Sequence, residues 1–289
     1  MTGPPLIKAP QGIEARSDNW ISSLALGKGQ VSAVFQHSLD LLISGTLINC
    51  HIRRDALHPL SLLVPHELLG NVQVGMRVEI QEQQILLGSN RYPWESTILP
   101  PPRVTNSVPS QHILKKALGM IRSLGRPSPL LTAWLGLPGR GLSWPRNHQE
   151  FLPVISIINQ TLHFPALDLS QLNACIGTGE GLTPSFDDFI SGILLARHAT
   201  GGTIREKEAF LGALPGRTTP TSIWQLKLAL EGFSSIRFEQ VLVNLQKSSL
   251  DLSNVLRCLN TGHSSGTDLF CGILAGFDPM VALAAERKE

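Results

Sequence analysis

The chain has 289 residues, of which 42% are hydrophobic and 16% are charged, and its formal net charge is +2. This composition provides enough apolar material for a core and excludes general disorder, and the small net charge gives no reason to expect nucleic acid or a membrane surface as a partner. The sequence has no apolar run near the ~20 residues of a bilayer span, no signal-peptide pattern and no metal-binding cysteine spacing, so a cytoplasmic protein is expected.

The first predicted domain, residues 1–104, is β-rich, because its apolar residues alternate with polar ones or form short runs. Met76, Val78 and Ile80 show the alternation most clearly. Strands are predicted over residues 31–35, 41–52, 60–65, 76–80 and 85–87. The proline-rich segment 98–110 is predicted to be a linker, since its prolines forbid regular pairing.

The second predicted domain, residues 105–289, is mostly helical. Apolar residues from Ile113 to Leu124 follow helical spacing, and Gly125 and Pro127 end the pattern. Further helices are predicted over residues 221–233 and 238–246. The predicted fold class is therefore α+β, a β-rich N-terminal part followed by a mostly helical C-terminal part.

A short motif occurs twice in the second domain. Ser-x-x-Asp, followed four residues after the Asp by Gly-Ile-Leu, begins at Ser185 and again, 80 positions later, at Ser265. One interpretation is a pair of capping boxes, in which each Ser and Asp satisfies N–H groups of its own first helical turn. Gly192 and Gly272 would weaken a helix interior, so they predict a close contact between the two helices.

The segments before these helices, "GTGEGLTP" (177–184) and "NTGHSSG" (260–266), hold more glycine and hydroxyl groups than a helix start needs. A helix N-terminus suits an anion, glycines let a ligand approach the backbone, and hydroxyls add donors. An anionic small molecule is therefore the expected ligand. The candidate substrate-binding residues are Gly177, Gly179, Gly181, Thr183, Ser185, Gly262, Ser264, Ser265 and Asp268.

The candidate catalytic residues are His263, Asp188 and Asp187. His263 can donate to an oxyanion or transfer a proton, although a lone histidine is also compatible with a structural role. Adjacent residues diverge by ~100° on a helix, so at most one of Asp187 and Asp188 is expected to face a ligand with Ser185. One of them can orient an amide N–H or bind Mg²⁺ through water. The sequence identifies no certain cofactor and no set of metal ligands.

The two loops are predicted to line one shared pocket, with carboxylates between the positive ends of two helices. The capping interpretation predicts instead that the loops lie apart.

The distribution of charged residues along the chain also leaves two interpretations open. Residues 96–149 carry basic side chains and no Asp or Glu, and residues 147–196 carry acidic side chains and no Lys or Arg. These blocks either form a basic wall facing an acidic loop or lie on separate solvated faces.

The segments "IGTGEGLTPSFDDFISGIL" and "GHSSGTDLFCGILAG", with "RTTPTSIWQLKLALEG" between them, resemble the AllH-like (YlbF/YahE-like) family. Members are similar to the small subunit of oxamate carbamoyltransferase. The resemblance implies a subunit that is inactive alone and works with an FdrA-like subunit and a second larger subunit. The implied reaction is the conversion of oxalurate and phosphate to oxamate and carbamoyl phosphate in allantoin and purine catabolism.

Two departures from the family pattern stand in the first loop and its helix. Glu180 replaces a common proline and Phe186 replaces a small residue. A carboxylate at 180 repels an anion at the same loop unless a cation screens it, so a different carbamoyl or acyl substrate is an alternative. Two further classes stay open: a non-catalytic assembly or ligand-binding subunit of an FdrA-like complex, and a metal-dependent phosphohydrolase that uses Asp187 and Asp188.

Overall fold

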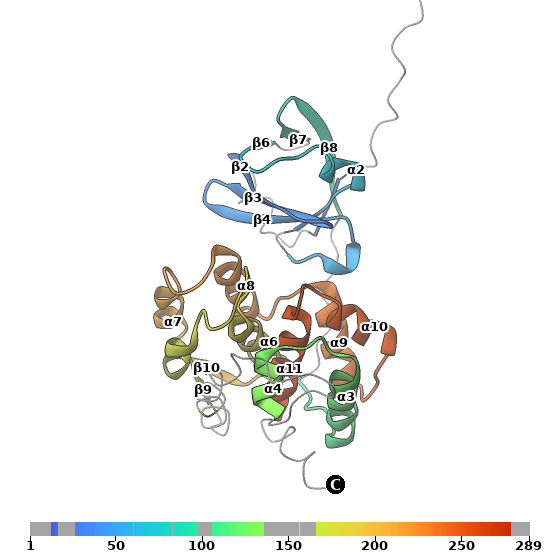
Figure 1. Cartoon of the computed structure of the whole chain (residues 1–289), viewed down its shortest axis with the longest axis vertical. Coiled ribbons are helices and arrows are strands. Elements are labelled where there is room, and N and C mark those ends of the chain that lie inside the picture. Colours follow the sequence, from blue (N-terminus) through green and yellow to red (C-terminus); the bar gives the residue numbers. More distant parts are fainter. Residues whose placement is uncertain are drawn as a thin grey trace, which may run out of the picture. The chain divides into compact units, whose positions relative to one another are not determined.

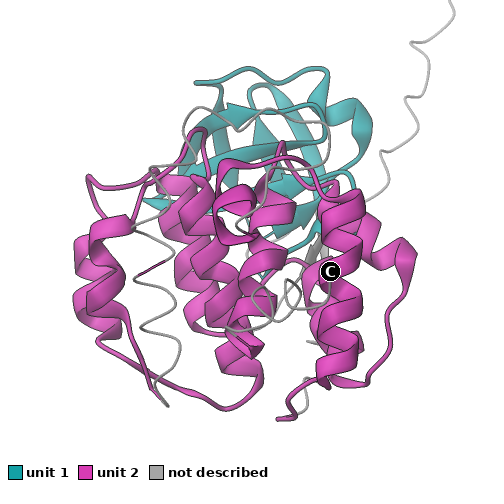
Figure 2. Cartoon of the chain, turned by 60° about the horizontal axis from the view of Figure 1, so that its bottom comes forward, with its two compact units in different colours: residues 1–101 teal, residues 102–289 magenta. Residues whose placement is uncertain are grey.

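The computed structural model describes residues 13–16, 27–59, 61–81, 84–97, 106–135, 156 and 166–278. The chain divides into two compact units, residues 1–101 and residues 102–289 (Figure 2). Strands dominate the described part of the first unit and helices that of the second (Figure 1), which confirms the predicted α+β class. In the described part of the chain, no helix combines the length and apolarity needed to cross a membrane.

The strands of the first unit close into a small barrel in the order β1-β5-β4-β3-β2-β6-β7-β8. Their bounds are β1 Ile13–Arg16, β2 Gly27–Val34, β3 Ser38–Ile43, β4 Thr46–His51, β5 Ser61–Leu63, β6 Arg77–Ile80, β7 Gln84–Leu87 and β8 Asn90–Thr97. Closure comes from β1, which pairs antiparallel with β5 and parallel with β8. In β3 the alternate residues Leu39, Leu41 and Ile43 are buried, so this face of the strand contributes to the core. Two short helical segments, η1 (Arg54–Ala56) and α2 (His66–Leu69), flank β5.

The predicted segments form strands, but one segment that was predicted as a single strand is two strands joined by a turn. Residues 41–52 do not form one strand, because the chain turns at Ser44 and Gly45, whose φ angles are 48° and 84°. Two successive residues with positive φ are typical of the tight turn of a β-hairpin. The strands at 13–16 and 90–97 were not predicted. Of the predicted linker, residues 98–105 lie outside the described residues, and residues 106–110 form neither helix nor strand.

The second unit is a helical assembly with one small parallel strand pair, β9 (Ala166–Asp168) and β10 (Thr203–Arg205). Its helices are α3 Gln111–Leu124, α4 Pro129–Leu135, η3 Leu169–Cys175, α6 Ser185–Ala199, α7 Lys207–Ala213, α8 Pro220–Leu230, α9 Ile236–Gln246, α10 Leu252–Leu259 and α11 Ser265–Phe277. The helices predicted over 113–124, 221–233 and 238–246 are confirmed as α3, α8 and α9. The apolar side chains of α3, α6, α8 and α11 share one core.

Helices α6 and α11 cross at the centre of this core (Figure 1), and glycines permit the contact. A Cβ atom on Gly192 would lie 2.1 Å from the carbonyl oxygen of Leu269, and one on Gly272 would lie 1.9 Å from that of Phe189. Both distances are far shorter than any real Cβ contact, so only glycine fits at either position. The predicted contact between the two helices at these glycines is therefore confirmed.

Candidate functional site

The first glycine loop, residues 177–184, depends on backbone conformations that favour glycine. Gly177, Gly179 and Gly181 have φ angles of 81°, 119° and 95°. A side chain at Gly177 would also collide with the backbone, because its Cβ would lie 2.0 Å from the carbonyl oxygen of Arg217. Gly181 differs, since nothing lies within 4 Å of the place where its Cβ would be. The loop is thus fixed at its start and open near its tip.

Asp187 fastens this loop to α6. Its Oδ1 accepts a hydrogen bond from the N–H of Gly177 at 2.9 Å, and its Oδ2 accepts one from the Thr218 hydroxyl. Burial raises the pKa of Asp187, while these hydrogen bonds act in the opposite direction. Both carboxylate oxygens are engaged, so the geometry gives Asp187 a structural role in holding the loop.

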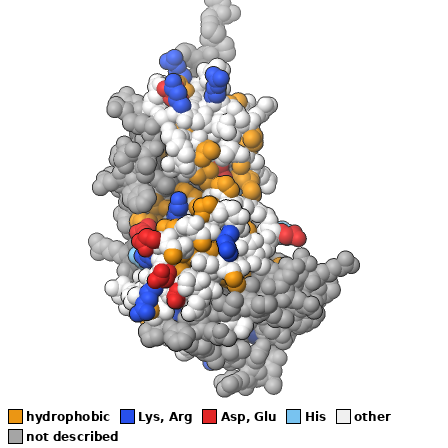
Figure 3. Space-filling model, turned by 90° about the vertical axis from the view of Figure 1, so that its left-hand side faces the viewer, with side chains coloured by type: hydrophobic (Ala, Val, Ile, Leu, Met, Phe, Trp, Pro, Cys, Tyr) orange, Lys and Arg blue, Asp and Glu red, His pale blue; other side chains and the backbone are white. Residues whose placement is uncertain are grey.

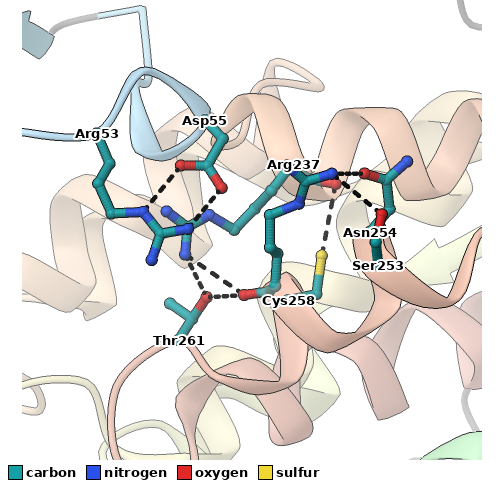
Figure 4. Close-up of polar contacts among 8 residues, drawn as sticks. Arg53, Asp55, Arg237, Ser253, Asn254, Cys258 and Thr261 are labelled. Carbon is teal, nitrogen blue, oxygen red and sulfur yellow. Dashed lines mark hydrogen bonds and ion pairs between the residues drawn. The ribbon is translucent and has the colours of Figure 1, made fainter.

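The second glycine loop, residues 260–264, is held by two arginines from other elements. The Arg126 guanidinium donates to the carbonyl oxygen of Gly262 at 2.7 Å. Arg237 of α9 donates to the Thr261 hydroxyl at 3.0 Å, and the Cys258 thiol donates to the Arg237 carbonyl oxygen at 3.4 Å (Figure 4). These contacts fix the start of α11 relative to α9 and α10.

The two loops meet at a hydrogen bond between hydroxyl groups. Thr183 Oγ1 and Ser265 Oγ lie 2.8 Å apart, with Thr183 just before α6 and Ser265 in the first turn of α11. The helix starts are therefore neighbours, as the repeated motif predicted. The two predicted capping boxes do not form. Pro184 and Ser264 are the N-cap residues, and neither accepts a side-chain capping bond.

Two buried carboxyl groups lie beneath this contact. Asp188 is 1% exposed and its Oδ1 accepts a hydrogen bond from Gln225 Nε2 of α8 at 2.8 Å. Asp268 is fully buried and its Oδ1 accepts a hydrogen bond from the Ser128 hydroxyl. Each carboxyl is thus anchored by a neutral donor from an element other than its own helix.

The surroundings of both carboxyls favour protonation. Burial raises the pKa of Asp268 to about 7, against hydrogen bonds from Ser128, Ser185 and Ser264 that lower it. Burial, and then the nearby charge of Asp268, raise the pKa of Asp188 well above its ordinary value. The hydroxyls of Ser265 and Thr183 lower the pKa of Asp188 in part. Each carboxyl therefore interacts with the serine that starts the other helix.

The other predicted site residues lie around this cluster. His263 and Gly262 are exposed in the second loop, where Gly262 has a φ of 61°. Glu180 is exposed in the first loop, whereas Phe186 is fully buried in the core. The cluster thus brings together Thr183, Ser185, Asp188, Ser264, Ser265 and Asp268, and His263 stays outside it.

Sequence reasoning missed the partners of these groups, namely Ser128, Thr218 and Gln225. Ser128 also accepts a hydrogen bond from the N–H of Leu131 at 2.9 Å. A serine followed by a proline at a helix start is a recognisable signal, so Ser128 was discoverable. Gln225 lies inside a helix, and no local pattern distinguishes it from a surface glutamine.

The described part of the chain contains no group of three His, Cys, Asp or Glu side chains that could hold a metal ion. The charged surface is mixed on the face drawn in Figure 3, where acidic and basic side chains lie near one another. Of the predicted basic segment, residues 98–105 and 136–150 lie outside the described residues. Arg126 is bound to the second loop, and Arg122 is exposed on α3.

Comparison with known proteins gives one family. No solved structure matches the chain significantly. Residues 175–277 match the model of a family described as oxamate carbamoyltransferase subunit AllH. This segment runs from the end of η3 through both glycine loops to the end of α11. The match supports a relationship between this segment and an oxamate carbamoyltransferase subunit. Over residues 175–277, the resemblance to the AllH family is confirmed.

Proposed function

We propose that this chain is a subunit of a cytoplasmic multi-subunit carbamoyltransferase that converts oxalurate and phosphate to oxamate and carbamoyl phosphate, or runs the reverse reaction. One observation carries the proposal. The segment that matches the AllH family contains both glycine loops, and these loops are joined by the Thr183–Ser265 hydrogen bond above a buried carboxyl pair. The place of this reaction in allantoin and purine catabolism is part of the proposal.

The site chemistry suits the transfer of a carbamoyl group between two anions. Two neighbouring helix starts supply N–H donors and partial positive charge, which stabilise phosphate or carboxylate oxygens. Thr183 and Ser265 add hydroxyls, and the open space at Gly181 leaves its backbone accessible. Transfer to phosphate needs positioning and oxyanion stabilisation, and it needs no covalent enzyme intermediate.

The partners we propose are an FdrA-like subunit and a second larger subunit, and the chain alone is expected to be silent. Its candidate catalytic histidine, His263, is exposed, and its buried carboxyls are not open to a ligand of substrate size. A partner that covers the loops would exclude water from the site and complete the set of catalytic groups. Any Mg²⁺ required for turnover would enter with phosphate, which is its usual partner in such sites.

Reconstitution tests the proposal. The three subunits are purified together, and carbamoyl phosphate is measured after addition of oxalurate and phosphate, with and without this chain. Turnover is expected only from the full complex. Asp188→Asn should abolish most activity, while Glu208→Gln on the exposed surface of α7 serves as the charge-matched control. Full turnover by the two larger subunits alone would contradict a catalytic contribution from this chain.

A non-catalytic assembly subunit is the second candidate, and the bonding of Asp187 favours it. Both oxygens of Asp187 are used to hold the loop, as expected of a purely structural motif. Co-purification separates the two functions. An assembly role predicts that loop variants lose the partners together with activity, whereas a catalytic role predicts that the complex stays intact while turnover falls.

A further inference from the structure

The carboxyl pair has an unusual distribution of hydrogen bonds. Gln225 and Ser128 each donate to the Oδ1 atom of one carboxyl. The Oδ2 atoms of Asp188 and Asp268 are buried, and neither has a hydrogen-bond partner. Leaving two buried carboxylate oxygens unsatisfied is strongly unfavourable if both carboxyls are ionised, so these two atoms indicate a missing positive charge.

A charge count gives the size of the missing charge. Two ionised carboxylates contribute two negative charges, and the starts of α6 and α11 contribute roughly half a positive charge each. About one negative charge is left over. Asp188 and Asp268 are almost completely removed from solvent, so neither bulk water nor a hydrated ion screens the remainder. A single small positive charge beside these unpartnered oxygens neutralises the site, and a proton is the smallest.

Among the residues that the structure describes, the neighbouring elements do not supply this charge. From the segment before α4, the Arg126 guanidinium donates to the loop carbonyl of Gly262. On α11, burial and the charge of Asp268 raise the pKa of the Cys271 thiol well above its ordinary value, so it stays neutral. From α8 the contact is the neutral Gln225, and on α6 the adjacent Asp187 is itself an acid.

We propose that the buried pair of Asp188 and Asp268 holds one proton, and that the Ser265 and Thr183 hydroxyls conduct this proton to a ligand bound at the glycine loops. Two carboxyls held close together in a buried site cannot both ionise, so one of them keeps its proton. Asp188 holds the proton more tightly than Asp268 does, because the charge of Asp268 adds to the effect of burial on Asp188. Ser265 and Thr183 are both partly exposed, so the path runs from the buried pair to the loop surface.

This relay rests on the proposed reaction, in which it has a defined task. An oxygen of hydrogen phosphate attacks the carbamoyl carbon of oxalurate, and the bond from that carbon to the oxamate nitrogen breaks. The departing nitrogen takes a proton from the relay. The proton that phosphate loses returns to the pair, so the carboxyls are unchanged after each turnover and no other reagent is consumed.

The first test counts protons in the full-length chain without any reaction. Aspartate carboxyl carbons are labelled with ¹³C and titrated by NMR, and Asp188→Asn and Asp268→Asn assign the two signals. We expect one protonated carboxyl at pH 8, above the pKa of about 7 of Asp268, and Glu208→Gln should leave it in place. Two carboxyls that are both ionised at pH 5 would overturn the proposal. The wild-type titration is informative even if a variant fails to fold.

The second test measures the relay in the reconstituted complex. Thr183→Val should lower kcat by about 10²-fold and raise KM by a much smaller factor, since a proton path contributes to the rate beyond any contact of the hydroxyl with substrate. Thr183→Ser keeps the hydroxyl and should restore the rate. An unchanged kcat in Thr183→Val would refute the relay. If the wild-type complex makes no carbamoyl phosphate, the proposed reaction fails, and the NMR titration still decides whether the pair holds a proton.

Discussion

Thr183 and Ser265 are 82 residues apart in sequence, yet their hydroxyl oxygens lie 2.8 Å apart. Each precedes or begins one of the two central helices, so this bond links the loops that the sequence marks with glycine. The contact joins two segments that could otherwise open independently, and its loss should therefore have a local effect.

Replacing Thr183 by Val removes this bond while keeping the shape of the side chain. We expect the free energy of unfolding to fall by about 1 kcal/mol, the typical net value of one hydrogen bond. Amide exchange should become faster in residues 177–184 and stay unchanged in the centre of α6. Thr203→Val, at an exposed position in β10, is the control. Equal exchange in both variants would show that the bond does not hold the loop.

The stability of the protein should decrease as the pH rises. Asp268 has a folded-state pKa of about 7 against an ordinary value of 3.8, so the folded state binds more protons than the unfolded state between these values. The stability that this group provides is complete below the unfolded pKa and is lost as the pH rises through 7. At ~1.4 kcal/mol per pKa unit, the loss between pH 5 and pH 8 is about 2 to 3 kcal/mol.

Urea unfolding of wild type and Asp268→Asn at these two pH values measures this loss. The variant should show a much smaller difference between them, because an amide at this position does not titrate. Glu208→Gln should behave like wild type. A wild-type protein that is more stable at pH 8 than at pH 5 would contradict the assigned direction.

The crossing of α6 and α11 should not tolerate a methyl group. In Gly272→Ala the new Cβ would be placed 1.9 Å from the carbonyl oxygen of Phe189, so the helices must separate. We expect a loss of at least about 2 kcal/mol in the free energy of unfolding, or no folded protein at all. Gly119→Ala in α3 is the matched control, since nothing lies within 4 Å of its Cβ position. That variant should be slightly more stable, by up to about 1 kcal/mol, because alanine favours a helix.

Asp187→Asn tests whether this residue is structural. An amide nitrogen would replace one of the two oxygens that accept hydrogen bonds from Gly177 and Thr218, which leaves a buried donor unsatisfied. The expected cost is about 1 to 3 kcal/mol, with faster exchange in residues 177–182 and 215–219. Glu231→Gln, an exposed carboxylate at the end of α8, is the control. Unchanged stability in Asp187→Asn would argue against the fastening role.

The sequence predicted the elements whose residues recur at regular spacing. The apolar spacing from Ile113 to Leu124 gave α3 nearly to the residue, and the repeated motif placed the starts of α6 and α11 together. The turn at Ser44 was missed because serine rarely has a positive φ, so the apolar run that contains it suggested one continuous strand.

The partners of the carboxyls were beyond local reasoning. Ser128 is 140 residues from Asp268 in sequence, and Gln225 is 37 residues from Asp188. Such contacts follow from how whole helices pack, and a spacing rule within one helix cannot supply them. For the same reason, the capping box was predicted from local sequence, whereas the packing of α6 against α11 determines the contacts that form.

The glycine crossing also makes the centre of the second unit nearly two-fold symmetric. Gly192 faces Leu269 as Gly272 faces Phe189, and Gly276 packs on Ala196, its counterpart 80 positions earlier. A homodimer with such an axis presents identical halves, so an asymmetric molecule on the axis binds equally well in two directions. Here both halves belong to one chain, which supplies an amide to Asp188 and a hydroxyl to Asp268. The carboxyl pair therefore has a polarity that a symmetric dimer cannot provide, because its two members receive chemically different donors.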